Sequence, residues 1–178
     1  MKKLILFLLI NISLLGFNYD NLLLKAQANI YPKLILLDKD IDKKLYNNTI
    51  IFTIVYHDSD YEKAKELEEL IYKNYQEHLG SYKLKIQIKE FKDIKDNIKT
   101  TAIYILKGLD SQVRSIIKKA QKLHVITFSY ELKYLKKGAL ISLHIEDETN
   151  IYFNNEINKL YKIKFLDIFY QVVRYYHD

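Results

Sequence analysis

The stretch VITFSYELKYLKKGALISLHIEDETNIYFN, residues 125–154, decides the fold class of this 178-residue chain. It begins with a short apolar run rich in β-branched residues, which is typical of a buried strand. A lysine-bearing segment then leads to Gly138, and two further apolar runs follow, separated by Glu146, Asp147 and Glu148. Three residues are too short a connection for a parallel crossover, so the last two runs are predicted to form an antiparallel hairpin.

Upstream of this stretch, apolar runs alternate with segments of helical periodicity. The runs at 50–56 and 102–106 predict strands that are buried on both faces. Residues 82–90 alternate between apolar side chains and mostly lysines, as expected of a strand nearer a sheet edge. We therefore expect a single α/β domain with a mostly parallel sheet flanked by helices and a C-terminal antiparallel hairpin.

Capping and stop signals predict where two of the helices begin and end. Ser59 and Glu62 have the spacing of a capping box, and Gly80 offers a stop for the helix between them. Asp110 or Ser111 is expected to cap the next helix.

Helices are also predicted at both ends of the domain. Residues 22–37 have a helical face, which Pro32 should kink or end near Tyr31, because proline removes a hydrogen bond and clashes with the preceding turn. A last helix is expected to run through Phe165, Phe169, Val172, Val173 and Tyr176.

The amino terminus has the pattern of a secretory signal peptide. Lys2 and Lys3 precede an apolar run over residues 4–15, which is too short to span a bilayer comfortably. We expect residues 1–16 to be a signal peptide and residues 17–178 to form the exported, periplasmic domain. A buried N-terminal core helix is the alternative.

The stretch quoted first also resembles the carboxy-terminal half of the YfiR family of periplasmic proteins. Thr127 and Ser129 match the family's T-x-S, and Lys136-Lys137-Gly138 matches its basic-basic-glycine. The run that ends in Phe153-Asn154 falls on the family's F-E-I-N without a gap. The resemblance assigns structural roles to Thr127, Ser129, Gly138, Phe153 and Asn154.

The chain also departs from the family pattern. Lys162 stands where the family usually has glycine, Tyr152 replaces the glutamate of F-E-I-N, and Leu166-Asp167 replaces Ser-Ser. The chain has no cysteine, so a redox role through disulfides is not implied. The resemblance implies a YfiR-like domain that is not an enzyme and that regulates a membrane-bound diguanylate cyclase or histidine kinase. It would do so by contacting the periplasmic domain of that enzyme, as in c-di-GMP signalling, with a homodimer as a further possibility.

The residues themselves offer little catalytic chemistry. The run His57-Asp58-Ser59-Asp60 follows a buried strand, where α/β sheets commonly place ligands, so a metal site or acid–base site is one interpretation. Helix capping and a solvated loop form the simpler interpretation, and the histidines lack metal-ligand spacing. We assign no catalytic, metal-binding or cofactor-binding residue. A small-molecule sensor or solute-binding domain, with a crevice near His57 and Ser129, is the alternative function.

Composition bears on the possible partners. The 28 basic residues exceed the 22 acidic ones, but the lysines are spread along the chain, so no nucleic-acid partner is expected. Sixteen tyrosines would suit an interface, although a codon bias toward A and T would also enrich tyrosine, lysine and isoleucine. The terminal run Arg174-Tyr175-Tyr176-His177 is a candidate contact surface.

Overall fold

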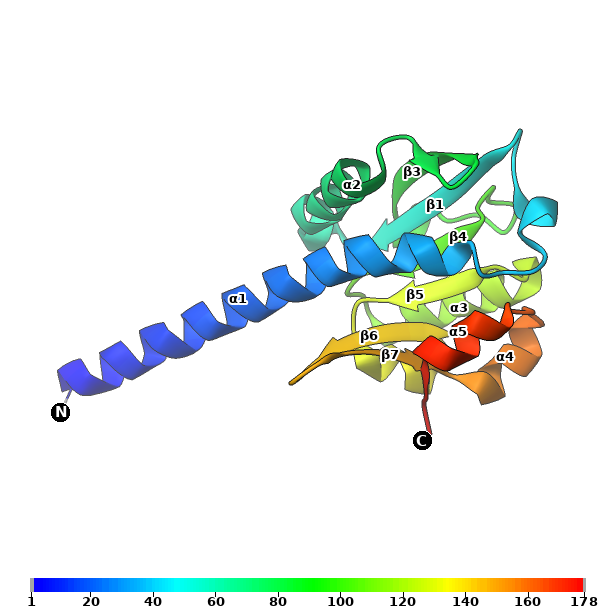
Figure 1. Ribbon diagram of the computed structural model, residues 1–178. Helices are drawn as coiled ribbons and strands as arrows, with labels where there is room; N and C mark the ends of the chain where they lie inside the picture. Colours follow the sequence, from blue (N-terminus) through cyan, green and yellow to red (C-terminus); the bar gives the residue numbers. More distant parts are fainter. Residues whose placement is uncertain (1, 178) are drawn as a thin grey trace.

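The computed structural model describes residues 2–177, and the surroundings of side chains are described from Tyr19 to His177. Within that range the strands form one eight-stranded sheet in the order β2-β3-β1-β4-β5-β6-β7-β8 (Figure 1). The strands are β1 (Thr49–Tyr56), β2 (His78–Leu79), β3 (Tyr82–Glu90), β4 (Ala102–Ile105), β5 (Ile126–Ser129), β6 (Ile141–Ile145), β7 (Thr149–Phe153) and β8 (Arg174–Tyr175).

The centre of the sheet is parallel, as the sequence predicts. Strands β3, β1, β4, β5 and β6 pair in parallel, whereas β6 and β7 form the expected antiparallel hairpin, with Ile141 opposite Phe153. The two-residue strands β2 and β8 lie at the sheet edges. The single α/β domain is thereby confirmed.

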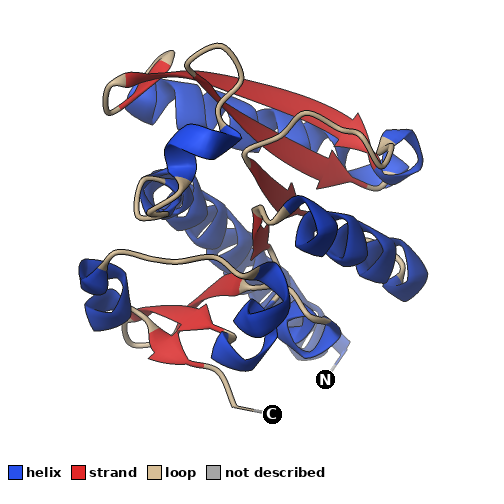
Figure 2. Cartoon of the chain, turned by 90° about the vertical axis from the view of Figure 1, so that its right-hand side faces the viewer, coloured by secondary structure: helices blue, strands red, loops and turns tan. Residues whose placement is uncertain are grey.

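Helices cover both faces of this sheet (Figure 2). The helices are α1 (Lys2–Ile35), α2 (Tyr61–Tyr75), α3 (Asp110–Leu123), α4 (Asn155–Tyr161) and α5 (Asp167–Val172), with shorter 3₁₀ turns at Ile41–Lys44 (η1), Asp58–Asp60 (η2), Phe91–Asp93 (η3) and Leu132–Lys137 (η4). Helices α1 and α2 lie against each other on one face. Helix α3 lies on the opposite face, together with η4 and α4.

Helix α1 departs from expectation at Pro32. The helix continues through Pro32 to Ile35 instead of ending near Tyr31. Leu34 and Ile35 are almost completely buried, so burial of the last turn offsets the hydrogen bond that proline cannot make. The first turns of α1, where the sequence predicts a signal peptide, extend away from the sheet (Figure 1). No helix among the described residues is long and apolar enough to span a membrane.

The predicted caps of α2 and α3 were wrong. Turn η2 occupies Asp58–Asp60, so α2 begins at Tyr61 and Ser59 lies too early to cap it. Gln76, the residue that follows α2, caps the helix with a positive φ of 55°. Gly80 lies in the turn between β2 and β3 instead. Helix α3 begins at Asp110, and the Gln112 side chain accepts a hydrogen bond from the Leu109 amide instead.

The expected long C-terminal helix was also wrong. Helix α4 ends at Tyr161, and Lys162 caps it with a positive φ of 56°. Helix α5 follows after a short extended segment. The chain then forms β8, which pairs in parallel with β7. Phe165 and Phe169 stack with ring centroids 3.8 Å apart, so aromatic burial fixes the short α5 where the sequence suggested one longer helix.

The Tyr31 side chain joins α1 to the sheet where β5 and β6 separate. Only two residue pairs, at Phe128 and Ser129, connect these strands. Beyond them the Tyr31 hydroxyl accepts a hydrogen bond from the Leu143 amide at 2.8 Å and donates one to the Ser129 carbonyl at 3.0 Å. Its ring stacks on Phe128 at 4.5 Å. A tyrosine side chain thus replaces one step of the backbone ladder.

Gln27 makes a second connection of the same kind. Its side chain is fully buried and accepts a hydrogen bond from the Tyr104 hydroxyl at 2.6 Å. Its amide donates to the Tyr130 carbonyl at 3.2 Å. Helix α1 therefore binds β4, β5 and β6 through polar groups that water cannot replace.

We expect Tyr31→Phe to lower the free energy of unfolding by about 1–3 kcal/mol, because the buried Leu143 amide loses its acceptor. Urea denaturation measures this change. The matched control is Tyr170→Phe, whose ring is 38% exposed, and it should leave the midpoint unchanged. Equal midpoints for the native protein and Tyr31→Phe would show that the hydrogen bonds of the Tyr31 hydroxyl do not contribute to stability.

Two left-handed positions, Gly138 and Lys162, should both be more stable with glycine. Gly138 has a φ of 102°, and a Cβ there would lie 3.2 Å from Ile117, so Gly138→Ala should destabilise by about 1–2 kcal/mol. Lys162, which stands where the family resemblance places glycine, should gain up to about 1 kcal/mol as Lys162→Gly. Thermal denaturation of both variants measures the signs, and a shift in the same direction for both would refute this account.

Candidate functional site

Two of the positions that carry the family resemblance, Thr127 and Gly138, meet at Tyr161 of α4, and a third, Ser129, lies further along β5. The Leu140 amide donates to Thr127 Oγ1 at 2.9 Å, and Thr127 Oγ1 lies 2.8 Å from the Tyr161 hydroxyl. That hydroxyl donates in turn to the Gly138 carbonyl at 3.0 Å. Ser129, also fully buried, reaches the Ile141 carbonyl at 3.4 Å. These bonds hold β5, η4 and β6 against α4.

The other two positions fasten the end of β7. The Asn154 side-chain Nδ2 donates to the Leu135 carbonyl at 3.0 Å. Its Oδ1 accepts from the Ile157 backbone amide, and Asn154 thereby caps α4. Phe153 packs edge-to-face on Phe169 at 5.0 Å. All five positions are buried and hold elements together. Tyr161, the residue that connects several of them, was not singled out from the sequence, because no short motif marks it.

The His57-Asp58-Ser59-Asp60 run lies at the carboxyl end of β1, as predicted. His57 and Asp58 border a hollow of about 260 Å³ together with Tyr56, Glu90 and Gln112. Ser59 is exposed and makes no cap. Among the residues that the structure describes, no group of histidine and acidic side chains could hold a metal ion.

A different cavity, at the carboxyl ends of β4 and β5, combines apolar and charged groups. We call it the α1 cavity. Its volume is about 270 Å³, and it is lined by Tyr19, Asp20, Leu23, Lys107, Tyr130, Glu131, Leu132, Lys133, Leu143 and His144. The carboxyl edge of a parallel sheet is the usual place for ligands in this class of fold.

The α1 cavity exists because β5 and β6 differ in length. Strand β5 ends at Ser129, whereas β6 continues to Ile145 and loses its neighbour on that side. Tyr19, Asp20 and Leu23 of helix α1 line the space beside this end of β6. The crevice expected near His57 and Ser129 is therefore two separate hollows, and Tyr130, not the buried Ser129, faces the second.

Tyr130 organises the charges of this cavity. Lys63 and Lys107 lie 4.9 and 5.4 Å from the centre of its ring, at distances where cations are attracted to the aromatic face. Lys63 also forms an ion pair with Asp20 at 3.0 Å. Burial, followed by the hydrogen bond with Asp20, raises the pKa of the Tyr130 hydroxyl far above its usual value, so the hydroxyl stays protonated.

Asp20 is the acidic group of this arrangement. Burial alone would raise the pKa of its carboxyl, but hydrogen bonds from Lys63 and Tyr130 and the positive charge of Lys107 hold that pKa below its usual value. Asp20 is therefore ionised at neutral pH. At the other side of the cavity the Tyr19 hydroxyl lies 3.1 Å from His144 Nδ1, and Glu131 pairs with Lys133 at 2.7 Å.

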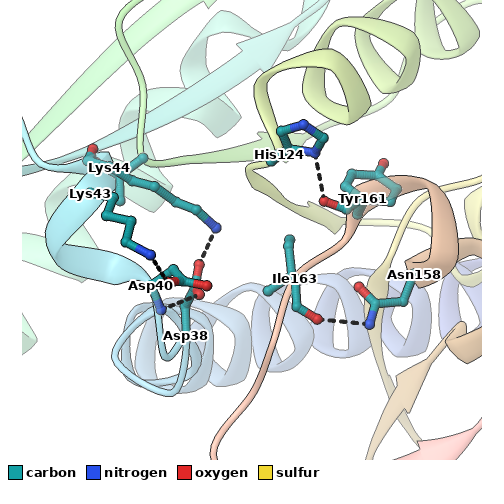
Figure 3. Close-up of polar contacts among 9 residues, drawn as sticks. Asp38, Asp40, Lys43, Lys44, His124, Asn158, Tyr161 and Ile163 are labelled. Carbon is teal, nitrogen blue, oxygen red and sulfur yellow. Dashed lines mark hydrogen bonds and ion pairs between the residues drawn. The ribbon is translucent and has the colours of Figure 1, made fainter.

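The amino edge of the sheet carries a polar cluster that is structural (Figure 3). Asp38 is 4% exposed, pairs with Lys44 and accepts the Asp40 amide at 3.0 Å. Nearby, His124 Nδ1 lies 2.9 Å from the Tyr161 carbonyl. These contacts bind the end of α1 to the turn before β1 and hold α4 against α3.

A hollow of about 330 Å³ beside Thr49 and Lys83 also lies at this edge of the sheet, away from the carboxyl ends of the strands.

Comparison with known proteins supports the fold. No family model and no curated protein matches the chain. A conserved domain protein from Vibrio cholerae O1 biovar El Tor is similar in structure, with a TM-score of 0.53, 15% identity, and coverage of 76% of this chain and 57% of that one. An ABC domain from Streptococcus pneumoniae in complex with L-Trp has a TM-score of 0.51 and 10% identity, over 80% of this chain and 61% of that one. The chain thus spans less than two thirds of either neighbour's length.

Asp20→Asn should destabilise the protein by up to about 1 kcal/mol at pH 7, since the carboxylate is 44% exposed and partly screened. The folded pKa of Asp20 is below its unfolded value of about 3.9, so its stabilisation is present above that value and is lost as the pH falls through the folded pKa. Denaturation at pH 7 and at about pH 3 measures the difference. Asp167→Asn, at a carboxylate that is 93% exposed, is the control without effect. If the difference in free energy of unfolding between the native protein and Asp20→Asn is the same at both pH values, this assignment is contradicted.

Proposed function

We propose that this chain is an exported, non-enzymatic domain that regulates a membrane-bound signalling enzyme by protein contact. The resemblance to the YfiR family and the signal-peptide pattern of residues 1–16 support this role and a periplasmic location. The enzyme would be a diguanylate cyclase or a sensor histidine kinase, contacted through its periplasmic domain. The observation that carries the proposal is an exposed apolar surface at the carboxyl terminus.

We call this the C-terminal surface. Its members are large apolar side chains that are 38–50% exposed, within ten residues of one another: Leu166, Ile168, Tyr170, Val172 and Tyr175. Ile168 and Val172 are four residues apart and share one face of α5, and the other members lie close to them in the sequence. Single exposed apolar residues are common, but neighbouring ones are typical of protein contact sites. Tyr175 belongs to the terminal run that the sequence offered as a contact surface.

The C-terminal surface has a rigid base. Phe153 contacts Phe165 and Phe169 edge-to-face, with ring centroids 5.6 and 5.0 Å apart. Strand β8 is the last strand of the sheet, so one of its edges has no neighbouring strand among residues 2–177. A partner could therefore bind the apolar side chains and the strand edge together.

The α1 cavity supports a second candidate function, a small-molecule sensor or solute-binding domain. It combines apolar walls with a few charged groups at the sheet edge where ligands commonly bind. Because one structural neighbour was solved with L-Trp, amino acids are reasonable first ligands to test. The two functions are compatible if a ligand bound in the α1 cavity controls the contact between the C-terminal surface and the signalling enzyme.

We expect the protein to capture a cyclase or sensor kinase from detergent-solubilised membranes of its own cells. The affinity tag is inserted after Asn97, in an exposed loop, because a tag at the carboxyl terminus would obstruct Tyr175. The double variant Ile168→Asp with Val172→Asp should lose this capture, since it places two charges in the C-terminal surface. Mass spectrometry identifies the captured proteins.

The control variant Leu109→Asp adds a charge at an exposed leucine at the start of α3 and should retain capture. Deletion of the gene should also change cellular cyclic-di-GMP or the autophosphorylation of the kinase. Recovery of only a second copy of this chain, with no signalling change, would reject the regulator in favour of a homodimer at this edge.

A further inference from the structure

We propose that the α1 cavity binds a small organic anion with a flat apolar body. This inference rests on the second candidate function, small-molecule binding, and adds the chemical class of the ligand. It comes from three properties of the cavity: its walls, its unbalanced positive charge and its size.

The walls suit a flat apolar group. Leu23, Leu132 and Leu143 come from α1, η4 and β6, and they line the cavity together with the rings of Tyr19 and Tyr130. Leu23 is 5% exposed and Leu143 is 1% exposed, so these walls are anchored in the core. Aromatic and aliphatic walls of this kind favour a planar ring.

Counted together with Lys63, which lies beside the lining and pairs with Asp20, the cavity has three lysines and two carboxylates, so one cation is left over. Lys63 is paired with Asp20, and Lys133 is paired with Glu131. Lys107 lines the cavity and forms no ion pair among the residues described, although its charge acts on Asp20 at longer range. It lies 5.4 Å from the centre of the Tyr130 ring, and an aromatic face attracts a cation without neutralising it.

The position of Lys107 is well fixed. It follows Leu106, whose amide donates to the Val55 carbonyl at 2.9 Å and thereby continues the sheet past β4. The Lys107 ammonium lies over the Tyr130 ring, and Lys107 lines the cavity. A carboxylate that meets Lys107 would form a charge-assisted hydrogen bond, while the apolar part of the same molecule lies against the leucines.

The size limits the ligand to one ring system with a short acidic arm. A volume of about 270 Å³ lies just below the usual range for small-molecule pockets, which begins at about 300 Å³. It is too small for a nucleotide or a peptide to be enclosed.

Indole-3-acetate is the probe that tests this inference. The chain contains no tryptophan, so the fluorescence anisotropy of the indole can be followed directly on the purified protein. We expect saturable binding, and we expect Lys107→Gln to weaken it at least about tenfold, because the glutamine keeps the polar stem but loses the charge. Tryptamine, which presents the same ring with a positive arm, should bind at least about tenfold more weakly to the native protein.

The control is Lys118→Gln, which removes an exposed lysine from α3 on the other face of the sheet and should bind like the native protein. Thermal denaturation confirms that both variants are folded. Equal affinity for Lys107→Gln, or tighter binding of tryptamine, would reject the anion and leave small-molecule binding in place. If neither probe binds up to millimolar concentrations, both the inference and the sensor function fail, whereas the contact surface is tested separately by membrane capture.

Discussion

The Tyr31 hydroxyl is the interaction on which the rest of this structure depends. Strands β5 and β6 share only two residue pairs, and the hydroxyl spans the point where they diverge. That group adds to the ladder between the central sheet and the hairpin and, with Gln27, seats α1 on the sheet. Because both its partners are buried backbone groups, loss of the hydroxyl would leave them without a hydrogen-bond partner in the protein.

The fold class follows from the sequence, because the buried strands and the hairpin are marked by local patterns of apolar residues. The helix ends were harder to predict, since Ser59 and Asp110 fit cap rules that the tertiary structure overrode with a 3₁₀ turn and with Gln112. The short α5 depends on the stacking of Phe165 on Phe169, which side-chain spacing alone does not reveal. Local rules describe single elements, whereas these ends are set by packing between elements.

The candidate site was predicted only in part. The sequence placed ligands at the carboxyl ends of the strands, and His57 lies beside a hollow there. The α1 cavity could not be inferred, because Tyr19, Lys107 and His144 are far apart in the chain and meet only when α1 crosses the sheet. Tyr161 escaped notice for the same reason, although it joins Thr127 to Gly138.

The seating of α1 also bears on when the chain can fold. Tyr31 bonds to residues 98 and 112 positions later, so this bridge forms only after residue 143 has been made, although α1 can pack on α2 earlier. Contacts between such distant residues slow folding, because a long loop must close before they form. The bridge between the central sheet and the hairpin is therefore one of the last contacts that synthesis makes available.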